Sequence, residues 1–319
     1  MPLRPSVMAA SVLVIWLAPL SAVAQGLTVT LIGTGNPEPS TERAGPATLV
    51  EAGGQRFVFD VGRGTAERLW QVAIPLGQIN QILLTHLHSD HVVGLPDVWL
   101  SGWQRTRFGQ RRSPLLVTGP PGTAAMTAAL RQAYVEDVRH RIAAGRLADS
   151  ATALVGHDTR VGLVYDRGGV KITAFAVDHG NPPIPAYGYR LEFGGRSVVI
   201  SGDTRPSENL VRFAKGADVL VHEVMAAFPN AAGGERVRQL LSSHTSPEEA
   251  AGIFVKVAPK LAVYTHVSLV TTPENRTALL GTIIPRTRSL YAGPLEIGED
   301  LMTIEVTDTV RVRRKGDRH

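Results

Sequence analysis

The 319-residue sequence contains no cysteine. That absence excludes disulfides, zinc–thiolate fingers, iron–sulfur clusters and cysteine nucleophiles, so any metal site must use histidine and carboxylate ligands. Lysine is scarce, and the formal net charge of +5 comes mainly from arginine. A pI near 9.7 fits nucleic-acid binding and equally fits a plain excess of arginine. Charged residues make up only 19% and hydrophobic residues 44%, which excludes a disordered chain.

The first 24 residues predict an exported protein. Arg4 precedes an apolar run over Val7–Leu20, and Ala22-Val23-Ala24 places small residues before Gln25. A basic start, a short apolar run and a small-residue cleavage motif are typical of a secretory signal peptide. The run is shorter than the roughly 20 residues that span a bilayer. We therefore expect a signal peptide over 1–24 and a periplasmic or secreted mature protein without a membrane span. An uncleaved N-terminal anchor is the alternative.

Strands and helices alternate along the rest of the chain in two similar halves. Glycine pairs join apolar runs in the manner of β-hairpins at Gly53-Gly54, Gly168-Gly169 and Gly194-Gly195. Helices are expected over Thr123–Val138, Ser207–Lys215 and Pro247–Val257. Hairpins mixed with strand–helix alternation favour an α/β (α+β) fold in which helices cover two sheets from outside. Because no linker separates the halves, we expect one domain over 25–308, followed by a basic tail at 309–319.

The densest group of metal-binding side chains is the segment THLHSDH, which begins at Thr85. It follows an apolar run that predicts a buried strand, and ligand sites in α/β proteins form at the carboxyl ends of strands. Side chains alternate along an extended chain, so His86 and His88 face the same way and reach one metal. Asp90 and His91 fall on the next turn and face a second position. Burying these groups without a shared ligand would be costly, so we expect a metal site.

The pattern HxHxDH resembles the signature of the metallo-β-lactamase superfamily, and the family's later motifs follow in order at His179, Asp203 and His266. The resemblance covers essentially the whole chain after the expected signal peptide. It implies a four-layer αββα sandwich with two metals at one edge. By this resemblance, one metal is held by His86, His88 and His179, the other by Asp90, His91 and His266, and Asp203 bridges them. Two Zn ions suit these ligands best, although Mn or Fe would accept the same types.

Other motifs resemble the ribonuclease Z branch of the superfamily and its arylsulfatase relatives. Gly202–Pro206 (GDTRP) matches that branch closely, Phe59–Thr65 (FDVGRGT) resembles its glycine motif, and the dipeptide ending at Glu223 resembles its His-Glu motif. The resemblance implies that a water activated between two metals attacks phosphorus or sulfur. His244, oriented by Glu223, would then protonate the leaving group. Asp90 would guide the attacking water as well as bind metal.

Two departures from the ribonuclease Z pattern weigh against tRNA as the substrate. Enzymes of that branch carry a tRNA-gripping arm between the third and fourth motifs, but here Asp203 follows His179 by only 24 residues. In addition, Leu269-Val270 stands after Ser268 where the family has Arg-Tyr. Together with the expected export, these departures favour a secreted dinuclear zinc hydrolase. Its expected substrate is a small anionic ester, either a sulfate ester or a phosphodiester, rather than tRNA.

Several hypotheses stay open beside this one. The same metal core would serve a lactonase, another hydrolase of this fold, or a 3′-tRNA-processing endoribonuclease. A non-enzymatic metal-binding protein is the least favoured, because no ligand of the set is missing. A homodimer is common in families that resemble this one. Finally, Trp99–Arg112 is either a rim that holds an aromatic or anionic substrate or a solvated amphipathic helix and loop with ordinary core tryptophans.

Overall fold

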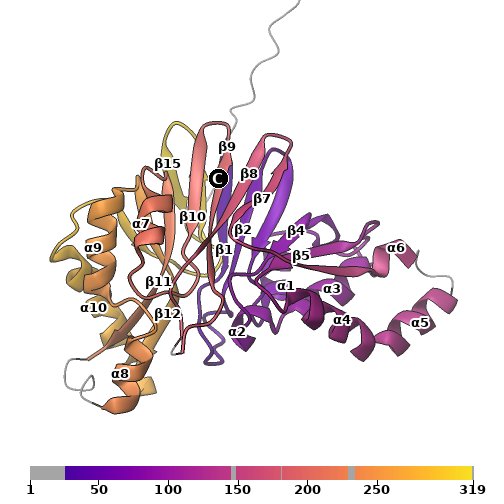
Figure 1. The fold of residues 1–319 in the computed structure, drawn as a ribbon, viewed down its shortest axis with the longest axis horizontal. Coiled ribbons are helices and arrows are strands. Elements are labelled where there is room, and N and C mark those ends of the chain that lie inside the picture. Colours follow the sequence, from indigo (N-terminus) through magenta and orange to yellow (C-terminus); the bar gives the residue numbers. More distant parts are fainter. Residues whose placement is uncertain (1–25, 145–148, 181, 229–233, 318–319) are drawn as a thin grey trace, which may run out of the picture.

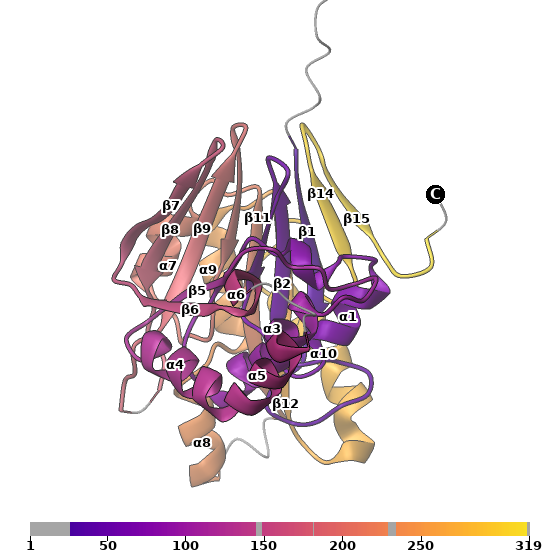
Figure 2. The same ribbon diagram turned by 90° about the vertical axis from the view of Figure 1, so that its right-hand side faces the viewer.

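Two packed β-sheets with helices on both outer faces make up the protein, as Figures 1 and 2 show from two directions. The computed structural model describes residues 26–144, 149–180, 182–228 and 234–317, so the expected signal peptide lies outside the described residues. The expected four-layer αββα sandwich is confirmed. Within the described ranges, no helix has the length and apolar character needed to cross a membrane.

The first sheet contains eight strands among the described residues, in the order β15-β14-β1-β2-β3-β4-β5-β6. Their bounds are Val310–Arg313 (β15), Thr303–Val306 (β14), Leu27–Gly33 (β1), Ala47–Ala52 (β2), Gln55–Phe59 (β3), Gln81–Leu83 (β4), Leu115–Gly119 (β5) and Leu154–Asp158 (β6). Pairing is antiparallel from β15 to β3 and parallel from β3 to β6.

The second sheet has seven described strands in the order β13-β12-β11-β10-β9-β8-β7. Their bounds are Leu295–Ile297 (β13), Leu261–Val270 (β12), Val219–Ala227 (β11), Arg196–Ile200 (β10), Tyr187–Phe193 (β9), Val170–Ala176 (β8) and Gly162–Arg167 (β7). Pairing is antiparallel from β7 to β10 and parallel from β10 to β13. Each sheet therefore has a parallel part in which several strands end at the same edge.

Helices cover the outer face of each sheet. In the first half they are α1 (Thr65–Gln71), α2 (Ser89–Val92), α3 (Leu95–Trp103), α4 (Thr123–Ala133), α5 (Val135–Ala143) and α6 (Asp149–Thr152), with the 3-10 helix η1 (Leu76–Gln78). In the second half they are α7 (Glu208–Ala214), α8 (Glu235–Leu241), α9 (Pro247–Val257) and α10 (Arg276–Arg288), with η2 (Pro273–Asn275). Figure 1 shows α7, α9 and α10 on one flank and α1, α3 and α4 on the other.

Alternation along the strands builds the core. In β10, Val198 and Ile200 pack between the two sheets, whereas Val199 packs outward with α7 and α9. Period-two alternation of this kind gives one strand two buried faces. Aromatic rings join the sheets, since Phe59 of the first sheet lies 5.4 Å from Tyr189 of the second, measured between ring centroids. Both sheets are thus held rigidly at the edge where the parallel strands end.

The structure differs from the sequence-based expectation in two elements. The helix expected over Thr123–Val138 is broken at Tyr134, whose φ of −106° and ψ of 15° separate α4 from α5. The expected basic tail at 309–319 overlaps β15, which pairs with β14. The reason is the alternation Val-Arg-Val-Arg, which turns Val310 and Val312 toward the core between the sheets and the arginines toward solvent.

Most of the hypothetical substrate rim belongs to the core. Trp99 and Trp103 are each 1% exposed. Arg111 is also buried, and its guanidinium donates to the carbonyls of Leu76 and Ile79. Burial lowers the pKa of Arg111 to about 10. These contacts show that the segment's aromatic and buried arginine side chains hold α3 against η1 and do not form a substrate rim.

Candidate metal centre

The potential ligands meet at one edge of the two sheets. The segment that carries His86, His88, Asp90 and His91 follows β4 of the first sheet and runs into α2. In the second sheet, the other ligands follow or lie near the ends of three strands, with His179 after β8, Asp203 after β10 and His266 within β12. Because β8 and β10 each pair antiparallel with β9, they run the same way and end at the same edge. Both sheets therefore supply ligands to one cluster.

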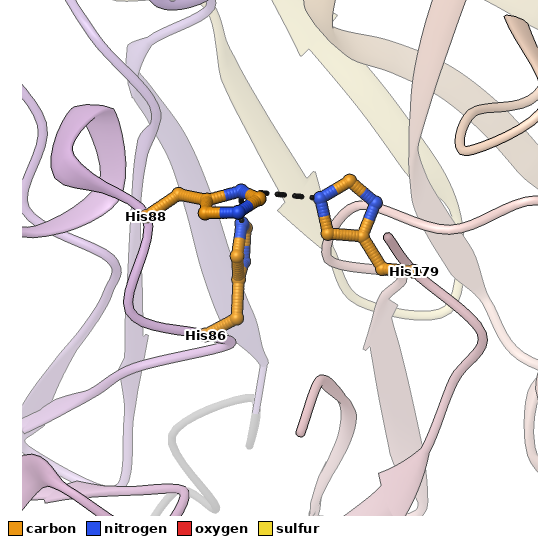
Figure 3. Close-up of side chains that lie close together, drawn as sticks. All are labelled: His86, His88 and His179. Atoms are coloured by element: carbon orange, nitrogen blue, oxygen red, sulfur yellow. Dashed lines mark hydrogen bonds between the residues drawn. The ribbon is translucent and has the colours of Figure 1, made fainter. Parts of the chain in front are cut away.

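Three imidazoles form the first group (Figure 3). The Nδ1 atom of His88 lies 3.0 Å from Nε2 of His86 and 3.2 Å from Nε2 of His179. The donor nitrogens of all three lie within 4.8 Å of one another. Three nitrogens around one point is the arrangement that a zinc site with one open position requires.

Asp90, His91 and His266 form the second group. The Oδ2 atom of Asp90 lies 3.3 Å from Nε2 of His266 and 3.4 Å from Nε2 of His91. His91 is 1% exposed, and its Nε2 atom finds no hydrogen-bond partner among the described residues. A buried polar nitrogen without a partner is costly, and a bound metal ion would satisfy it. The donor set therefore fits a metal.

Asp203 lies between the two groups. Its Oδ2 atom is 3.2 Å from Nε2 of His266, 3.4 Å from His91, 3.8 Å from His179 and 4.0 Å from His86. The preceding residue fixes this position, since Gly202 has a φ of +61° and a Cβ there would lie 2.7 Å from the carbonyl oxygen of Tyr187. Only glycine tolerates both constraints. Asp203 thus faces both groups at once, as a bridging ligand must.

The protonation states of His86 and Asp203 suit metal binding. Burial disfavours the charge on His91, but Asp203 and Asp60 raise its pKa well above the usual value. Burial lowers the pKa of His86 well below its usual value, and the neighbouring His91 acts in the same direction. Burial alone would raise the pKa of Asp203, but His266 and His91 hold it well below the ordinary value. Neutral imidazole and ionised carboxylate are the forms that bind metals. The folded chain therefore favours the ligand form at both residues.

Hydrogen bonds orient two of the imidazoles. The Nδ1–H group of His91 donates to Oδ2 of Asp60 over 2.8 Å, and Nδ1–H of His179 donates to the carbonyl of Ser243 over 2.9 Å. Asp60 also accepts from the backbone N–H and the hydroxyl of Thr85, at 2.7 and 2.8 Å. These bonds leave Nε2 of each imidazole free to face a metal.

His244 and Glu223 lie beside the cluster as a pair. The Nδ1–H group of His244 donates to Oε1 of Glu223 over 3.0 Å, and the same oxygen accepts from the N–H of Thr204 over 3.0 Å. Burial disfavours the charge on His244, but the Glu223 carboxylate raises its pKa to about 9. The ring centroid of His244 lies 5.0 Å from that of His179. This arrangement holds a protonated imidazole next to the candidate ligands.

A cavity of about 860 Å³ opens over the cluster. Candidate ligands and His244 line it together with apolar side chains, namely Ile184, Met225, Val237, Leu240 and Leu269. A cavity with this mixed lining suits a substrate that has one reactive polar group and an apolar portion.

The structure brings together all nine residues singled out from the sequence. They are His86, His88, Asp90, His91, His179, Asp203 and His266 as candidate ligands, with Glu223 and His244 beside them. Sequence reasoning did not single out the apolar lining that comes from β11, α8 and β12. It also missed Asn36, which lines the cavity. The signal for Asn36 was a turn directly after a buried strand.

Comparison with known proteins agrees with this geometry. A family model described as a beta-lactamase superfamily domain matches residues 55–267. The ribonuclease Z of Mycobacterium marinum is 37% identical over 285 residues, which cover 87% of this chain and 98% of the relative. That of Mycobacterium bovis is 38% identical over 288 residues, covering 88% and 98%.

Solved structures show the same fold. The metallo-beta-lactamase fold protein YhfI of Bacillus subtilis has a TM-score of 0.67 at 17% identity, covering 88% of this chain and 99% of its own. The short form of human tRNase Z has a TM-score of 0.64 at 23% identity, covering 87% and 98%. The cluster, the fold and the curated relatives together place the chain in the metallo-β-lactamase superfamily, and within it the chain belongs to the ribonuclease Z family.

Proposed function

We propose that this protein is a zinc-dependent endoribonuclease of the ribonuclease Z type, which hydrolyses a phosphodiester bond at the 3′ side of precursor tRNA. One observation carries the proposal: a seven-residue ligand cluster with the His244–Glu223 pair beside it, in a chain 37% identical to a ribonuclease Z over 87% of its length. Arylsulfatase activity is not part of the proposal, because the curated relatives named above carry the name ribonuclease Z.

The proposed roles follow from the geometry. His86, His88 and His179 would hold one zinc ion and Asp90, His91 and His266 the other, with Asp203 between them. Two such ions supply Lewis acidity at the phosphoryl oxygens and activate a water. Within the chain, Asp90 orients the attacking water. As the P–O bond breaks, His244 gives its proton to the leaving oxygen, and Glu223 holds the imidazole in place for that transfer.

The expectation of a small anionic ester substrate, with tRNA set aside, is wrong. The curated relatives are ribonucleases Z, and one protein of the same fold is a tRNase Z. The missing arm does not argue against RNA cleavage. The Mycobacterium marinum relative is covered to 98% within 285 aligned residues, so it has no room for a long insertion relative to this chain either.

Activity on a panel of substrates tests the proposal. Zinc-loaded protein is expected to cleave a 3′-extended precursor tRNA and bis(nitrophenyl) phosphate, and to leave nitrophenyl sulfate and a lactone intact. His88→Ala is expected to lower both cleavage rates at least about a thousandfold, because metal ions contribute several kcal/mol to the transition state. His140→Ala removes an exposed histidine of α5 and should change neither rate. Sulfate hydrolysis without RNA cleavage, or full activity in His88→Ala, would contradict the proposal.

We also propose that residues 1–24 export the protein, on the support of the signal-peptide pattern alone. An exported enzyme would meet RNA outside the cytoplasm, so precursor tRNA would be the substrate only of protein that keeps to the cytoplasm. Cell fractionation followed by N-terminal sequencing tests this separately from the activity. Export predicts a chain beginning at Gln25 outside the cytoplasm. A chain that keeps Met1–Ala24 and stays in the cytoplasm would contradict export and leave the proposed activity untouched.

A further inference from the structure

His266 occupies an unusual backbone conformation for a candidate metal ligand. Its φ is +44°, in the left-handed region that residues other than glycine seldom enter. The pairing between β11 and β12 shifts at the same place: Glu223 pairs with Thr265, but Val224 pairs with Val267. His266 is therefore the extra residue of a β-bulge, which re-aims its side chain away from the regular direction of the strand.

The His266 ring lacks a short hydrogen bond at its Nδ1 atom. Whereas His91 and His179 each donate a short hydrogen bond through Nδ1, the Nδ1 atom of His266 has a 3.4 Å contact with the hydroxyl of Ser268. Metal-binding histidines are usually fixed by a strong bond at the second ring nitrogen. Its Nε2 atom contacts Asp90 and Asp203, but a bound metal would take the place of those contacts. With metal present, the position of the backbone would therefore set where the His266 imidazole points.

The turn after β1 holds that backbone from outside the strand. The N–H of Val267 donates to the carbonyl of Thr34 over 2.9 Å, and Nδ2 of Asn36 donates to the carbonyl of Val267 over 3.2 Å. Asn36 is 7% exposed. Its own Oδ1 atom accepts from the N–H of Glu38 over 2.9 Å, which fixes the orientation of the amide. Both polar backbone groups of the residue after His266 are thus tied to this turn.

The turn is itself anchored by Asp300, a residue distant in sequence. The backbone N–H and the hydroxyl of Thr34 both donate to Oδ1 of Asp300, at 2.9 and 2.8 Å. Asp300 also accepts from the N–H of Ala44 and from the guanidinium of Arg68, at 2.7 and 3.0 Å. A turn fixed at this many points can impose a strained conformation on a neighbouring strand.

We propose that Asn36 is a positioning residue for His266: by binding the carbonyl of Val267 it holds the bulge and aims the imidazole at the second metal position. The proposal rests on the proposed two-metal function. Asn36 acts through Val267 rather than on the substrate, so its removal should weaken one metal position and spare the other, which His86, His88 and His179 supply.

Three variants of Asn36 separate its two hydrogen bonds. Asn36→Asp keeps an acceptor for the N–H of Glu38 but loses the donor to Val267, whereas Asn36→Ala loses both. Asn36→Ser keeps a shorter donor and covers the case in which the larger changes unfold the chain. The matched control is Asn80→Ala, because Oδ1 of Asn80 also accepts one backbone N–H, from Arg56. Asn80 precedes β4, at the end of that strand away from the metal ligands.

Stepwise titration of metal-free protein with Co²⁺, followed by its d–d absorption, reports each position without requiring activity. Asn36→Asp and Asn36→Ala are expected to bind the first ion as the wild type does and to lose about 10- to 100-fold in affinity for the second. Asn36→Ser should fall between them and the wild type, and Asn80→Ala should match the wild type. A circular dichroism melt of each metal-free variant reports whether it is folded.

The outcomes distinguish this inference from the proposed function. Wild-type affinity for both ions in Asn36→Asp and Asn36→Ala would overturn the role of Asn36 while leaving the function in place. Equal weakening at both positions in folded variants would also overturn it, because that is the result of general loosening. If the wild-type protein binds fewer than two ions, the proposed two-metal function itself fails.

Discussion

Asp203→Asn is expected to lower kcat/KM for RNA at least about a thousandfold and to reduce the bound metal from two ions to one or none. The substitution keeps the size of the side chain and removes its charge. Oδ2 of Asp203 lies within 4.0 Å of Nε2 atoms in both ligand groups, so its carboxylate is the shared negative charge of the cluster. Losing several kcal/mol of transition-state stabilisation corresponds to this factor, since each ~1.4 kcal/mol is tenfold.

Steady-state kinetics and elemental analysis of the purified variant check this result. Asp218→Asn is the matched control, since Asp218 is also a buried aspartate at 5% exposure. It accepts from the N–H of Ser197 over 2.7 Å and pairs with Lys260, at the start of β11 and away from the cluster. The control should keep its metal and its activity. If Asp203→Asn protein binds two ions and cleaves RNA at the wild-type rate, Asp203 is not part of the metal centre.

His244→Ala is expected to lower kcat for RNA by about a hundredfold to ten-thousandfold, the usual contribution of a general acid, with metal content unchanged. The leaving oxygen of RNA is a poor leaving group and needs a proton, whereas nitrophenolate leaves without one. The loss should therefore be large for RNA and small for bis(nitrophenyl) phosphate. Because Glu223 orients the His244 imidazole, Glu223→Gln should show the same contrast to a smaller degree.

Rates on the two substrates, measured side by side, check this second prediction. His157→Ala, on an exposed part of β6, is the control for loss of a histidine. An equal loss on both substrates would assign His244 to binding rather than to proton transfer. A loss of metal in His244→Ala would instead assign it to the ligand set.

The candidate ligands were accessible to sequence reasoning because their chemistry is local. Two imidazoles two positions apart after an apolar strand point one way by backbone geometry alone, and the later motifs stand at the ends of apolar runs. The layered fold followed from hairpins and strand–helix alternation in the same way. In both cases a few adjacent residues carry the information.

Features that depend on distant contacts were not predictable. Asn36 donates a hydrogen bond to the carbonyl of Val267. No pattern in the residues around Asn36 predicts that contact. Arg111 looked like a surface cation, yet it is 3% exposed because carbonyls of a separate turn accept its hydrogen bonds. The apolar lining of the cavity needs α8 and the end of β12 to lie at the same site. Such pairs are set by tertiary packing, which a single sequence does not encode locally.

The origin of the ligands in both sheets has a consequence for the stability of the chain. Four candidate ligands follow β4 of the first sheet, and three come from the second. Bound metal would act as a cross-link between the two layers, joining segments as distant in sequence as His86 and His266. A disulfide constrains a chain in this way, and this chain has no cysteine to form one. Ions that bind only the folded state stabilise it. The free energy of unfolding would therefore rise with the concentration of available metal.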